Sequence, residues 1–192
     1  MPAFLTINSE TLLWVDKLKY LGIWLCSGKS FTNDLSEMRR KFFTSVNVIL
    51  SKCKYTSDFI KLQLLESHCL PILLYAAESL DLNATQLKSI NSWWNSVYRK
   101  IFGYAKWESV RQLICLSGRL DILHLTNLRC ITFVKQTVLN GDLNKILGCV
   151  ITRYVCRSDY KNLLDVFHCQ ASWSISKTKA MMFFSFRLSC LN

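Results

Sequence analysis

The sequence predicts a mainly α-helical fold, in which a short N-terminal β-hairpin or meander precedes a bundle of about five to seven helices. Apolar residues make up 51% of the 192 residues, enough for a packed core. Only two prolines and six glycines interrupt the chain, which is typical of a helix-rich architecture. We expect residues 1–30 to form the β element, 31–139 a helical domain, and 140–192 a helical, partly irregular C-terminal extension.

The β element is predicted from short runs of apolar and β-branched residues. Ala3 to Ile7 and Thr11 to Val15 are two such runs, separated by the turn signal of Asn8 and the serine after it. A further run, Leu18 to Leu25, ends before a Ser-Gly pair. Because an isolated pair of strands is only marginally stable in water, this element should pack against the rest of the chain.

The first long helix is expected after Thr32 or Asn33, since either side chain can act as an N-cap. Apolar residues recur at three- and four-residue spacing from Leu35 to Cys53, and two acidic residues near its start suit the positive end of the helix dipole. The basic residues of this segment lie mostly away from the apolar stripe. The helix therefore has one apolar side and one basic flank.

A second helix is expected from Ser57 to Cys69, ending or restarting at Pro71. The segment that follows, Leu70 to Ala77, is apolar on almost every side. It should therefore be deeply buried.

A third long helix is expected from Ala84 to Phe102. Asn83 or Thr85 can cap its start, and Gly103 is well placed to end it in a left-handed conformation. Further helices are expected at Ser109 to Leu116, Asp121 to Leu139 and Asp142 to Tyr154, with a loop at Ser172 to Ser176.

The formal net charge of +11 is spread along the whole chain. Such an excess favours a polyanionic partner, usually nucleic acid and sometimes an anionic membrane surface. The alternative is an ordinary set of solvated lysines and arginines. No apolar run approaches the roughly 18 residues of a membrane-spanning helix, so we expect no membrane span.

The nine cysteines predict a reducing environment. Their number is odd, several lie within apolar stretches, and the chain opens without the pattern of a secretory signal peptide. Buried free thiols explain these features better than a disulfide framework. We expect an intracellular protein, nuclear or cytoplasmic.

Several short segments carry a family resemblance through their order and spacing. Lys19 to Gly22 reads Lys-Tyr-Leu-Gly, and Leu70 to Glu78 reads Leu-Pro-Ile-Leu-Leu-Tyr-Ala-Ala-Glu. Downstream are Trp94 to Gly103, Trp107 to Val110 and Gly118 to Leu125. Together, over roughly residues 10 to 137, these segments resemble the C-terminal part of non-LTR (LINE-type) retrotransposon reverse transcriptases.

The resemblance implies a primer-grip hairpin from the end of the polymerase palm, followed by a thumb. In the second segment Ala76 stands where the family usually has glycine, so the local backbone can differ there. The parent enzyme would be an RNA-directed DNA polymerase. The chain would be its fragment, with the missing palm domain as a protein partner and RNA and DNA primer–template as ligands.

The resemblance also implies that the catalytic centre is missing. The family's Tyr-x-Asp-Asp motif is absent, and no Asp-Asp pair occurs in the chain. Palm carboxylates hold two Mg²⁺ ions in such enzymes. We therefore expect Mg²⁺ only in the intact parent, no cofactor in this chain, and no catalytic role for Asp16, which stands alone. The chain alone should incorporate no nucleotides.

Nucleic-acid binding is expected through phosphates, without reading of sequence. The hairpin would approach the primer, and basic residues on the first and third long helices would track a phosphate backbone. A solvated surface is the alternative for each basic run. Of the adjacent tryptophans, Trp94 belongs to the apolar stripe, which leaves Trp93 as the surface candidate. The candidate binding residues are Lys19, Tyr20, Gly22, Arg39, Arg40, Lys41, Lys52, Lys54, Trp93, Arg99, Lys100, Lys106 and Arg111.

Zinc is considered because relatives carry a Cys/His knuckle near the C-terminus. The nearest candidates, Cys149, Cys156, His168 and Cys169, lack the close Cys-x₂₋₄-Cys spacing of structural zinc sites. We therefore expect no metal there. The chain also has adjacent His68 and Cys69. Adjacent residues on a helix point apart, so these two should not form a catalytic Cys–His pair, and Cys69 should be a buried thiol.

Two other functions remain open from the sequence. The chain can be a helical protein-interaction module whose basic surface meets an acidic partner. A third possibility is an amphipathic role at a membrane surface.

Overall fold

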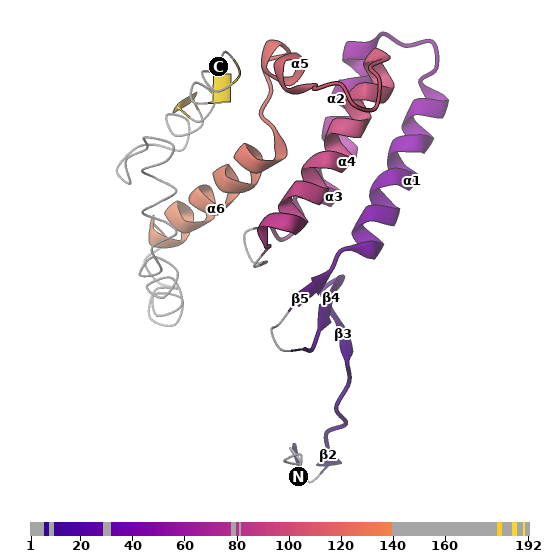
Figure 1. Ribbon diagram of the computed structural model, residues 1–192. Helices are drawn as coiled ribbons and strands as arrows, with labels where there is room; N and C mark the ends of the chain where they lie inside the picture. The colour runs from indigo at the N-terminus through magenta and orange to yellow at the C-terminus, as the bar shows by residue number, and fades with distance from the viewer. Residues whose placement is uncertain are drawn as a thin grey trace.

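The computed structural model describes residues 6–7, 10–28, 32–77, 80, 82–139, 180–181, 186–187 and 190. Short strands open the chain and helices make up the remainder of the long described ranges (Figure 1). The predicted fold class, a small N-terminal β element followed by a helical bundle, is therefore confirmed.

Two antiparallel sheets begin the chain. The first consists of two-residue strands, and the second has the strand order β3-β4-β5. The second sheet extends past residue 30, the boundary expected for the β element, because its last strand, β5, pairs with β4 in a register that places Trp24 opposite Asp34. The strands are β1 (Thr6–Ile7), β2 (Glu10–Thr11), β3 (Lys17–Tyr20), β4 (Ile23–Cys26) and β5 (Thr32–Asp34).

A tight turn divides the run that we expected to be one strand, Leu18 to Leu25. Its two central residues, Leu21 and Gly22, have φ angles of 46° and 82°. Two positive φ angles are the signature of a type I′ hairpin turn, which matches the twist of the flanking strands. Gly22 thus forms the tip of the turn, and not a bulge within a strand. Leucine rarely adopts such a φ angle, so Leu21 is strained.

The strand expected from Thr11 to Val15 is wrong beyond its first residue. The pairing between β1 and β2 stops at Thr11, so the residues that follow have no neighbouring strand among the described residues. They form an extended connection to β3 (Figure 1). Leu13 is 87% exposed and Trp14 is 71% exposed. This connection therefore presents apolar side chains to solvent.

The expected N-cap of the first helix is also wrong. Thr32 and Asn33 lie in β5, because strand pairing with β4 places them in the sheet. Leu35 is the N-cap residue instead and makes no side-chain capping bond. The backbone N–H of Ser36 donates to Oδ1 of Asp34 at 2.9 Å. The start of the helix is therefore set by tertiary strand pairing, which overrides local capping preference.

The helices follow the predicted order closely. Their bounds are α1 (Ser36–Lys52), α2 (Asp58–His68), α3 (Leu70–Leu73), α4 (Ala84–Phe102), α5 (Arg111–Leu116) and α6 (Ile122–Leu139).

Local sequence determines both ends of α4, as predicted. Asn83 is the cap: its side chain accepts from the N–H of Gln86, and the Gln86 side chain accepts from the N–H of Asn83. Gly103 ends the helix with a φ angle of 71°. Pro71 lies in the first turn of α3, where a missing N–H does no harm, so α3 can begin at Leu70, directly after Cys69, the C-cap residue of α2.

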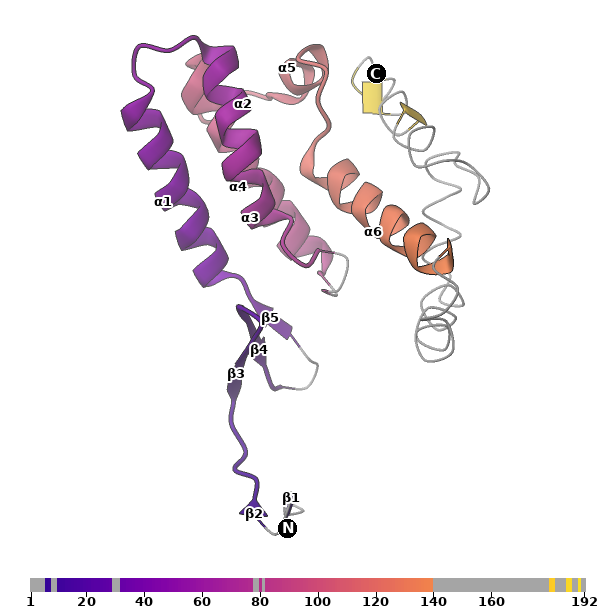
Figure 2. The same ribbon diagram turned by 180° about the vertical axis from the view of Figure 1, so that it is seen from behind.

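The helices form a bundle around one core. The α1 and α2 helices are antiparallel neighbours, while α1 and α4 run in the same direction and α6 is inclined to them (Figure 1 and Figure 2). Phe42, Leu62, Trp94 and Tyr98 are at most 1% exposed and join three helices. Each such side chain contributes about 2 kcal/mol through burial. Phe186, from the C-terminal described residues, is also fully buried in this core.

The segment from Leu70 to Ala77 is only partly buried, contrary to expectation. Leu73 and Ala77 are buried, but Tyr75 is 51% exposed. Its hydroxyl donates to the carbonyl oxygen of Leu21 at 3.0 Å. The hydroxyl finds its acceptor at the hairpin tip, which is why this side chain leaves the core. Two of the segments that carry the family resemblance are thus in direct contact.

Several predictions fall outside the described residues. These are the helix at Asp142 to Tyr154, the loop at Ser172 to Ser176, and Glu78 of the second resembling segment. Cys149, Cys156, His168 and Cys169 lie outside them too. Within the described part of the chain, none of the helices has the length and apolar character needed to span a lipid bilayer.

Candidate nucleic-acid interface

The basic residues singled out from sequence do not form one surface. Successive residues of an α-helix point about 100° apart, so Arg39 and Lys41 face directions that differ by about 160°. The run from Arg39 to Lys41 therefore divides between two flanks of α1. Taken with the other candidates, the predicted residues fall into three places: a face between α1 and α4, the β3–β4 hairpin, and the far end of the bundle.

The first place brings together residues of α1 and α4. The guanidinium carbon of Arg39 lies 5.8 Å from the ring centroid of Trp93 and 6.0 Å from that of Phe43. The ammonium of Lys100 lies 5.8 Å from the same Phe43 ring and 3.4 Å from Oδ1 of Asn47. We call these five residues the α1–α4 face. It places two cations from different helices around one aromatic ring.

The α1–α4 face keeps its positive charge. Within the described residues, neither Arg39 nor Lys100 forms an ion pair with a carboxylate. Both are exposed, and their partners are aromatic rings, which hold a cation without neutralising it. Arg40 is exposed on the adjacent outer side of α1 and also has no ion pair among them. An anionic ligand would thus meet uncompensated charge here.

A polar hollow of about 300 Å³ lies at one end of the α1–α4 face. Arg39 and Trp93 line it together with residues from the starts of both helices, including Ser36 and Thr85. The side-chain amide of Gln86 donates to a backbone carbonyl of β5 at 2.9 Å and so joins the two starts. The N-terminal ends of both helices lie here, and their dipoles add positive potential to that of Arg39, which the carboxylate of Asp34 in the same lining partly offsets.

In the second place, the predicted cations are already paired. Lys19 and Lys41 each lie 2.9 Å from the carboxylate of Glu37. The indole N–H of Trp24 donates to the same carboxylate at 2.6 Å. These donors, with Lys19 first, lower the pKa of Glu37 to about 2. A phosphate that binds Lys19 or Lys41 would therefore have to displace Glu37. Because these ion pairs are exposed and contribute little free energy, such a displacement would cost little.

Of the other two predicted hairpin residues, Gly22 lines a pocket and Tyr20 does not. Tyr20 is 62% exposed on β3, and Gly22 forms the turn. The hairpin tip, the start of α1 and the Pro71 to Tyr75 region enclose a mainly apolar pocket of about 420 Å³. The hairpin is thus a packing element as well as a candidate binding element.

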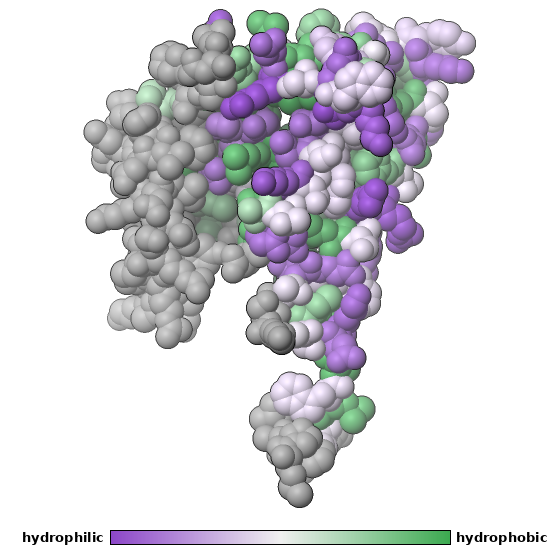
Figure 3. All heavy atoms as spheres, viewed as in Figure 1, coloured by the Kyte–Doolittle hydropathy of each residue, from purple (hydrophilic) through white to green (hydrophobic). Residues whose placement is uncertain are grey.

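The third place is the end of the bundle where α1 and α4 finish. Lys52, Lys54 and Lys106 are exposed there and form no ion pair with other described residues. Arg99 instead donates through Nε to the carbonyl oxygen of Glu108 at 2.9 Å, which ties the connection after α4 to that helix. Figure 3 shows hydrophilic side chains over this end and along α1. Arg111 belongs to α5, where its guanidinium lies 5.9 Å from the Phe186 ring centroid.

The tryptophans separate as predicted, with one refinement. Trp94 is 1% exposed in the core. Trp93 is only partly buried, but Arg39 lies over its ring. Sequence reasoning missed Phe43 and Asn47, which complete the α1–α4 face. The one sequence feature that could have identified them is their spacing of four and eight residues from Arg39, which places all three residues on one side of the helix.

The six described cysteines are free thiols, as expected, but only Cys69 is buried and the other five are partly exposed. Cys69 is fully buried, its Sγ lies 3.2 Å from the hydroxyl oxygen of Ser45, and burial raises the pKa of its thiol. The neighbouring His68 is exposed, so the two side chains point apart, as expected. The described residues contain no cluster of three or more possible metal ligands.

The chain matches no family model, and no curated protein or solved structure shows significant similarity to it.

Proposed function

We propose that this chain is a nucleic-acid-binding helical domain that grips a duplex through its phosphates, without reading base sequence. The observation that carries the proposal is the α1–α4 face, where Arg39 and Lys100 converge on Phe43 without a carboxylate partner in the described part of the chain. Cations that approach from two helices can contact phosphates on either side of a groove. The net charge of +11 supports the same ligand.

The dimensions of α4 suit a duplex segment. Its 19 residues span about 28 Å at 1.5 Å per residue. At about 3.4 Å per base pair, that length corresponds to roughly eight base pairs. The grip would therefore involve a short stretch of primer–template, and several weak phosphate contacts would contribute to it together.

The parent enzyme in this proposal is the reverse transcriptase of a non-LTR retrotransposon, an RNA-directed DNA polymerase. The supporting observations are the resembling segments and the contact that joins two of them, from Tyr75 to Leu21. In this view the chain is the non-catalytic thumb with its hairpin, Mg²⁺ belongs to the missing palm, and the protein acts inside the cell. Primer extension by the purified chain with Mg²⁺ would contradict the non-catalytic assignment.

The test is neutralisation of the two central cations in the double variant Arg39→Gln, Lys100→Gln. Fluorescence anisotropy with a labelled RNA–DNA duplex at low salt should show binding that is weaker by about tenfold or more. The matched control is Lys88→Gln, because Lys88 is an exposed lysine on the opposite flank of α4. If Lys88→Gln lowers the logarithm of the binding constant by half as much as the double variant, the loss follows net charge alone, and the α1–α4 face is not the binding surface.

A protein-interaction module is the second candidate. It is favoured by the exposed Leu13 and Trp14 and by the outer edge of β3, which pairs only with β4 among the described strands. In the reverse transcriptase proposal, this edge would face the palm. Absence of duplex binding at low salt, together with a complex to an acidic protein that Leu13→Ser, Trp14→Ser abolishes, would favour this function over the first.

A further inference from the structure

Two turns of the same construction lie at the end of the bundle. Residues 53–56 connect α1 to α2, and residues 105–108 lie between α4 and α5. In both, the backbone N–H of the fourth residue donates to the carbonyl oxygen of the first at 3.1 Å. Each turn carries a lysine at its second position and an aromatic residue at its third: Lys54 and Tyr55 in one, Lys106 and Trp107 in the other.

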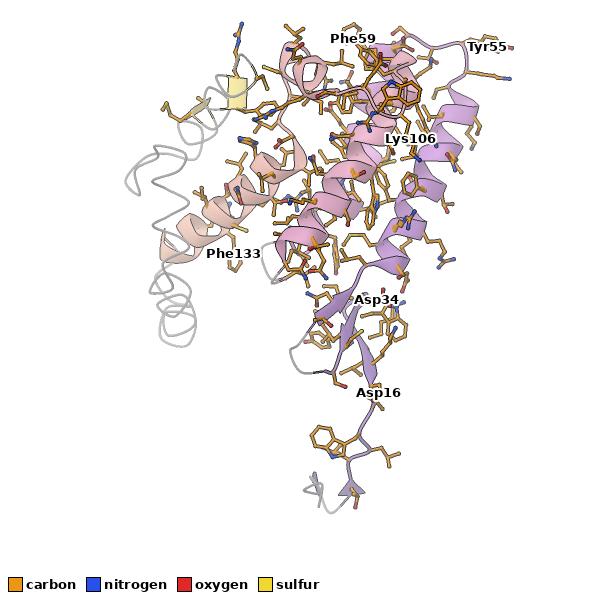
Figure 4. All side chains as sticks on the ribbon, in the orientation of Figure 1. Asp16, Asp34, Tyr55, Phe59, Lys106 and Phe133 are labelled. Carbon is orange, nitrogen blue, oxygen red and sulfur yellow. The ribbon has the colours of Figure 1, made fainter. Side chains whose placement is uncertain are left out.

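An aromatic contact holds the two connections together. Phe59 in the first turn of α2 and Phe102 in the last residue of α4 meet edge to face, with ring centroids 6.4 Å apart. Figure 4 shows Tyr55, Phe59 and Lys106 at the same end of the molecule, with Tyr55 pointing outward from its turn. The repeated turns are therefore parts of one surface, which we call the end surface: Lys54, Tyr55, Phe59, Lys106 and Trp107.

The aromatic rings of the end surface are not used for packing. Tyr55 is 99% exposed, Trp107 is 87% exposed and Phe59 is 65% exposed. Large aromatic side chains usually bury most of their area in a folded domain, so three exposed rings at one end indicate a binding surface. The turn hydrogen bonds hold the backbone that presents Tyr55 and Trp107, which limits the entropy lost on binding.

The charge of the end surface is positive and available. Lys54 and Lys106 form no ion pair with any described residue. Of the nearby acidic side chains, Asp58 lies 3.0 Å from Lys61. The carboxylate of Glu108 accepts the N–H of Ala105 at 2.5 Å and has no cationic partner among the described residues, so it offsets part of the positive charge beside Trp107. Tyr55 and Trp107 thus each follow a lysine whose ammonium has no carboxylate partner among the described residues.

We propose that the end surface binds single-stranded nucleic acid, with bases stacked on Tyr55 and Trp107 and phosphates held by Lys54 and Lys106. In a single strand every base is followed by a phosphate, which matches the alternation of ring and cation on these turns. A closed duplex does not fit, because its bases are stacked on one another. A lipid surface fits less well, since charged or polar residues flank both Tyr55 and Trp107 in the sequence.

The inference rests on the proposed function for the class of ligand but uses different residues. The α1–α4 face would hold duplex, and the end surface would hold an unpaired extension of it. The two binding events can therefore fail separately in an experiment.

The test is the double variant Tyr55→Ala, Trp107→Ala in the full chain. Anisotropy would be measured at low salt with a labelled oligothymidylate of about twelve nucleotides, and separately with a dumbbell duplex whose ends are closed by loops. Affinity for the single strand should fall by about tenfold or more, and affinity for the dumbbell should remain unchanged. Loss of binding in Lys54→Gln, Lys106→Gln with a reduced salt dependence would support the assigned phosphate contacts.

Two matched variants control for exposed aromatic area and for ring chemistry. Trp14→Ala removes another largely exposed tryptophan, far from the end surface, and should leave the affinity unchanged. Tyr55→Phe, Trp107→Phe retains rings and should bind within about threefold of the unaltered chain. Full single-strand affinity in the alanine double variant would overturn the inference. So would ring-dependent cosedimentation with phosphatidylserine vesicles without oligonucleotide binding.

The same titrations separate this inference from the proposed function. If Arg39→Gln, Lys100→Gln leaves dumbbell binding intact while Tyr55→Ala, Trp107→Ala abolishes single-strand binding, the duplex grip fails and the end surface stands. The reverse pattern removes the end surface and leaves the duplex grip.

Discussion

Replacing Ala76 by glycine should stabilise the fold. Ala76 follows Tyr75 in the turn after α3 and has a φ angle of 52°. A residue with a Cβ atom loses about 1–2 kcal/mol in the left-handed region, whereas glycine adopts it freely. Glycine also has more conformational freedom in the unfolded chain than alanine, which reduces the stabilisation by about 0.5–1 kcal/mol. The net stabilisation of Ala76→Gly is therefore about 0.5–1 kcal/mol.

The assay is urea unfolding monitored by tryptophan fluorescence in reducing buffer. The midpoint should rise without a change in slope, and the melting temperature should rise by about 2 °C. The matched control is Ala77→Gly, because Ala77 is 3% exposed and its φ angle is not positive. That variant should lose about 1 kcal/mol. If Ala76→Gly destabilises the chain as much as Ala77→Gly, the assigned backbone strain is wrong.

Three further predictions concern single contacts. Asn83→Ala removes the capping box of α4 and should reduce the free energy of unfolding by about 1 kcal/mol, whereas Asn83→Asp should retain most of it. Tyr75→Phe removes the hydroxyl bond to Leu21 and should lower the unfolding free energy by about 0.5 kcal/mol; an unchanged value would show that the bond contributes nothing. The pKa of Glu37 is lowered from 4.5 to about 2. The contribution of its ion pairs to the free energy of unfolding is therefore complete above pH 4.5 and is lost as the pH falls toward 2. Glu37→Gln should flatten this part of the pH–stability profile, and an identical acid transition in both proteins would contradict the pairing.

The sequence was sufficient to predict the helices because their signals are local. Asn83 and Gly103 specify both ends of α4, and the apolar spacing along it places Trp94 in the core. The start of α1 was mispredicted for the opposite reason. Asn33 has a good local capping side chain, but strand pairing with β4 draws it into the sheet, and this pairing is a tertiary effect.

The candidate site was only partly predictable. A list of basic residues contains no information about which of them already have partners. Lys19 and Lys41 meet Glu37 from different elements, so their neutralisation depends on the packing of the hairpin against α1. Arg39 and Lys100 converge because the Phe43 ring lies between α1 and α4 and both cations contact it, which no local pattern reveals.

The substitution of Ala76 shows how a small departure from a pattern gains meaning in three dimensions. The resemblance led us to expect glycine at this position, and the positive φ angle of Ala76 is a conformation that glycine adopts without strain. The same backbone turn directs Tyr75 toward the hairpin tip at Leu21. This residue pair thus links the hairpin to the helical bundle, in addition to the contacts of Lys19 and Trp24 with Glu37.

The salt dependence of duplex binding is the most direct test of a phosphate grip on the α1–α4 face. The logarithm of the binding constant for duplex DNA should fall linearly with the logarithm of salt concentration, by about 0.9 for each phosphate neutralised. Removing both cations in Arg39→Gln, Lys100→Gln should make the slope shallower by about 1.8, and Lys88→Gln should leave it unchanged. An identical slope for the double variant and the unaltered chain would show that these two cations do not contact phosphate.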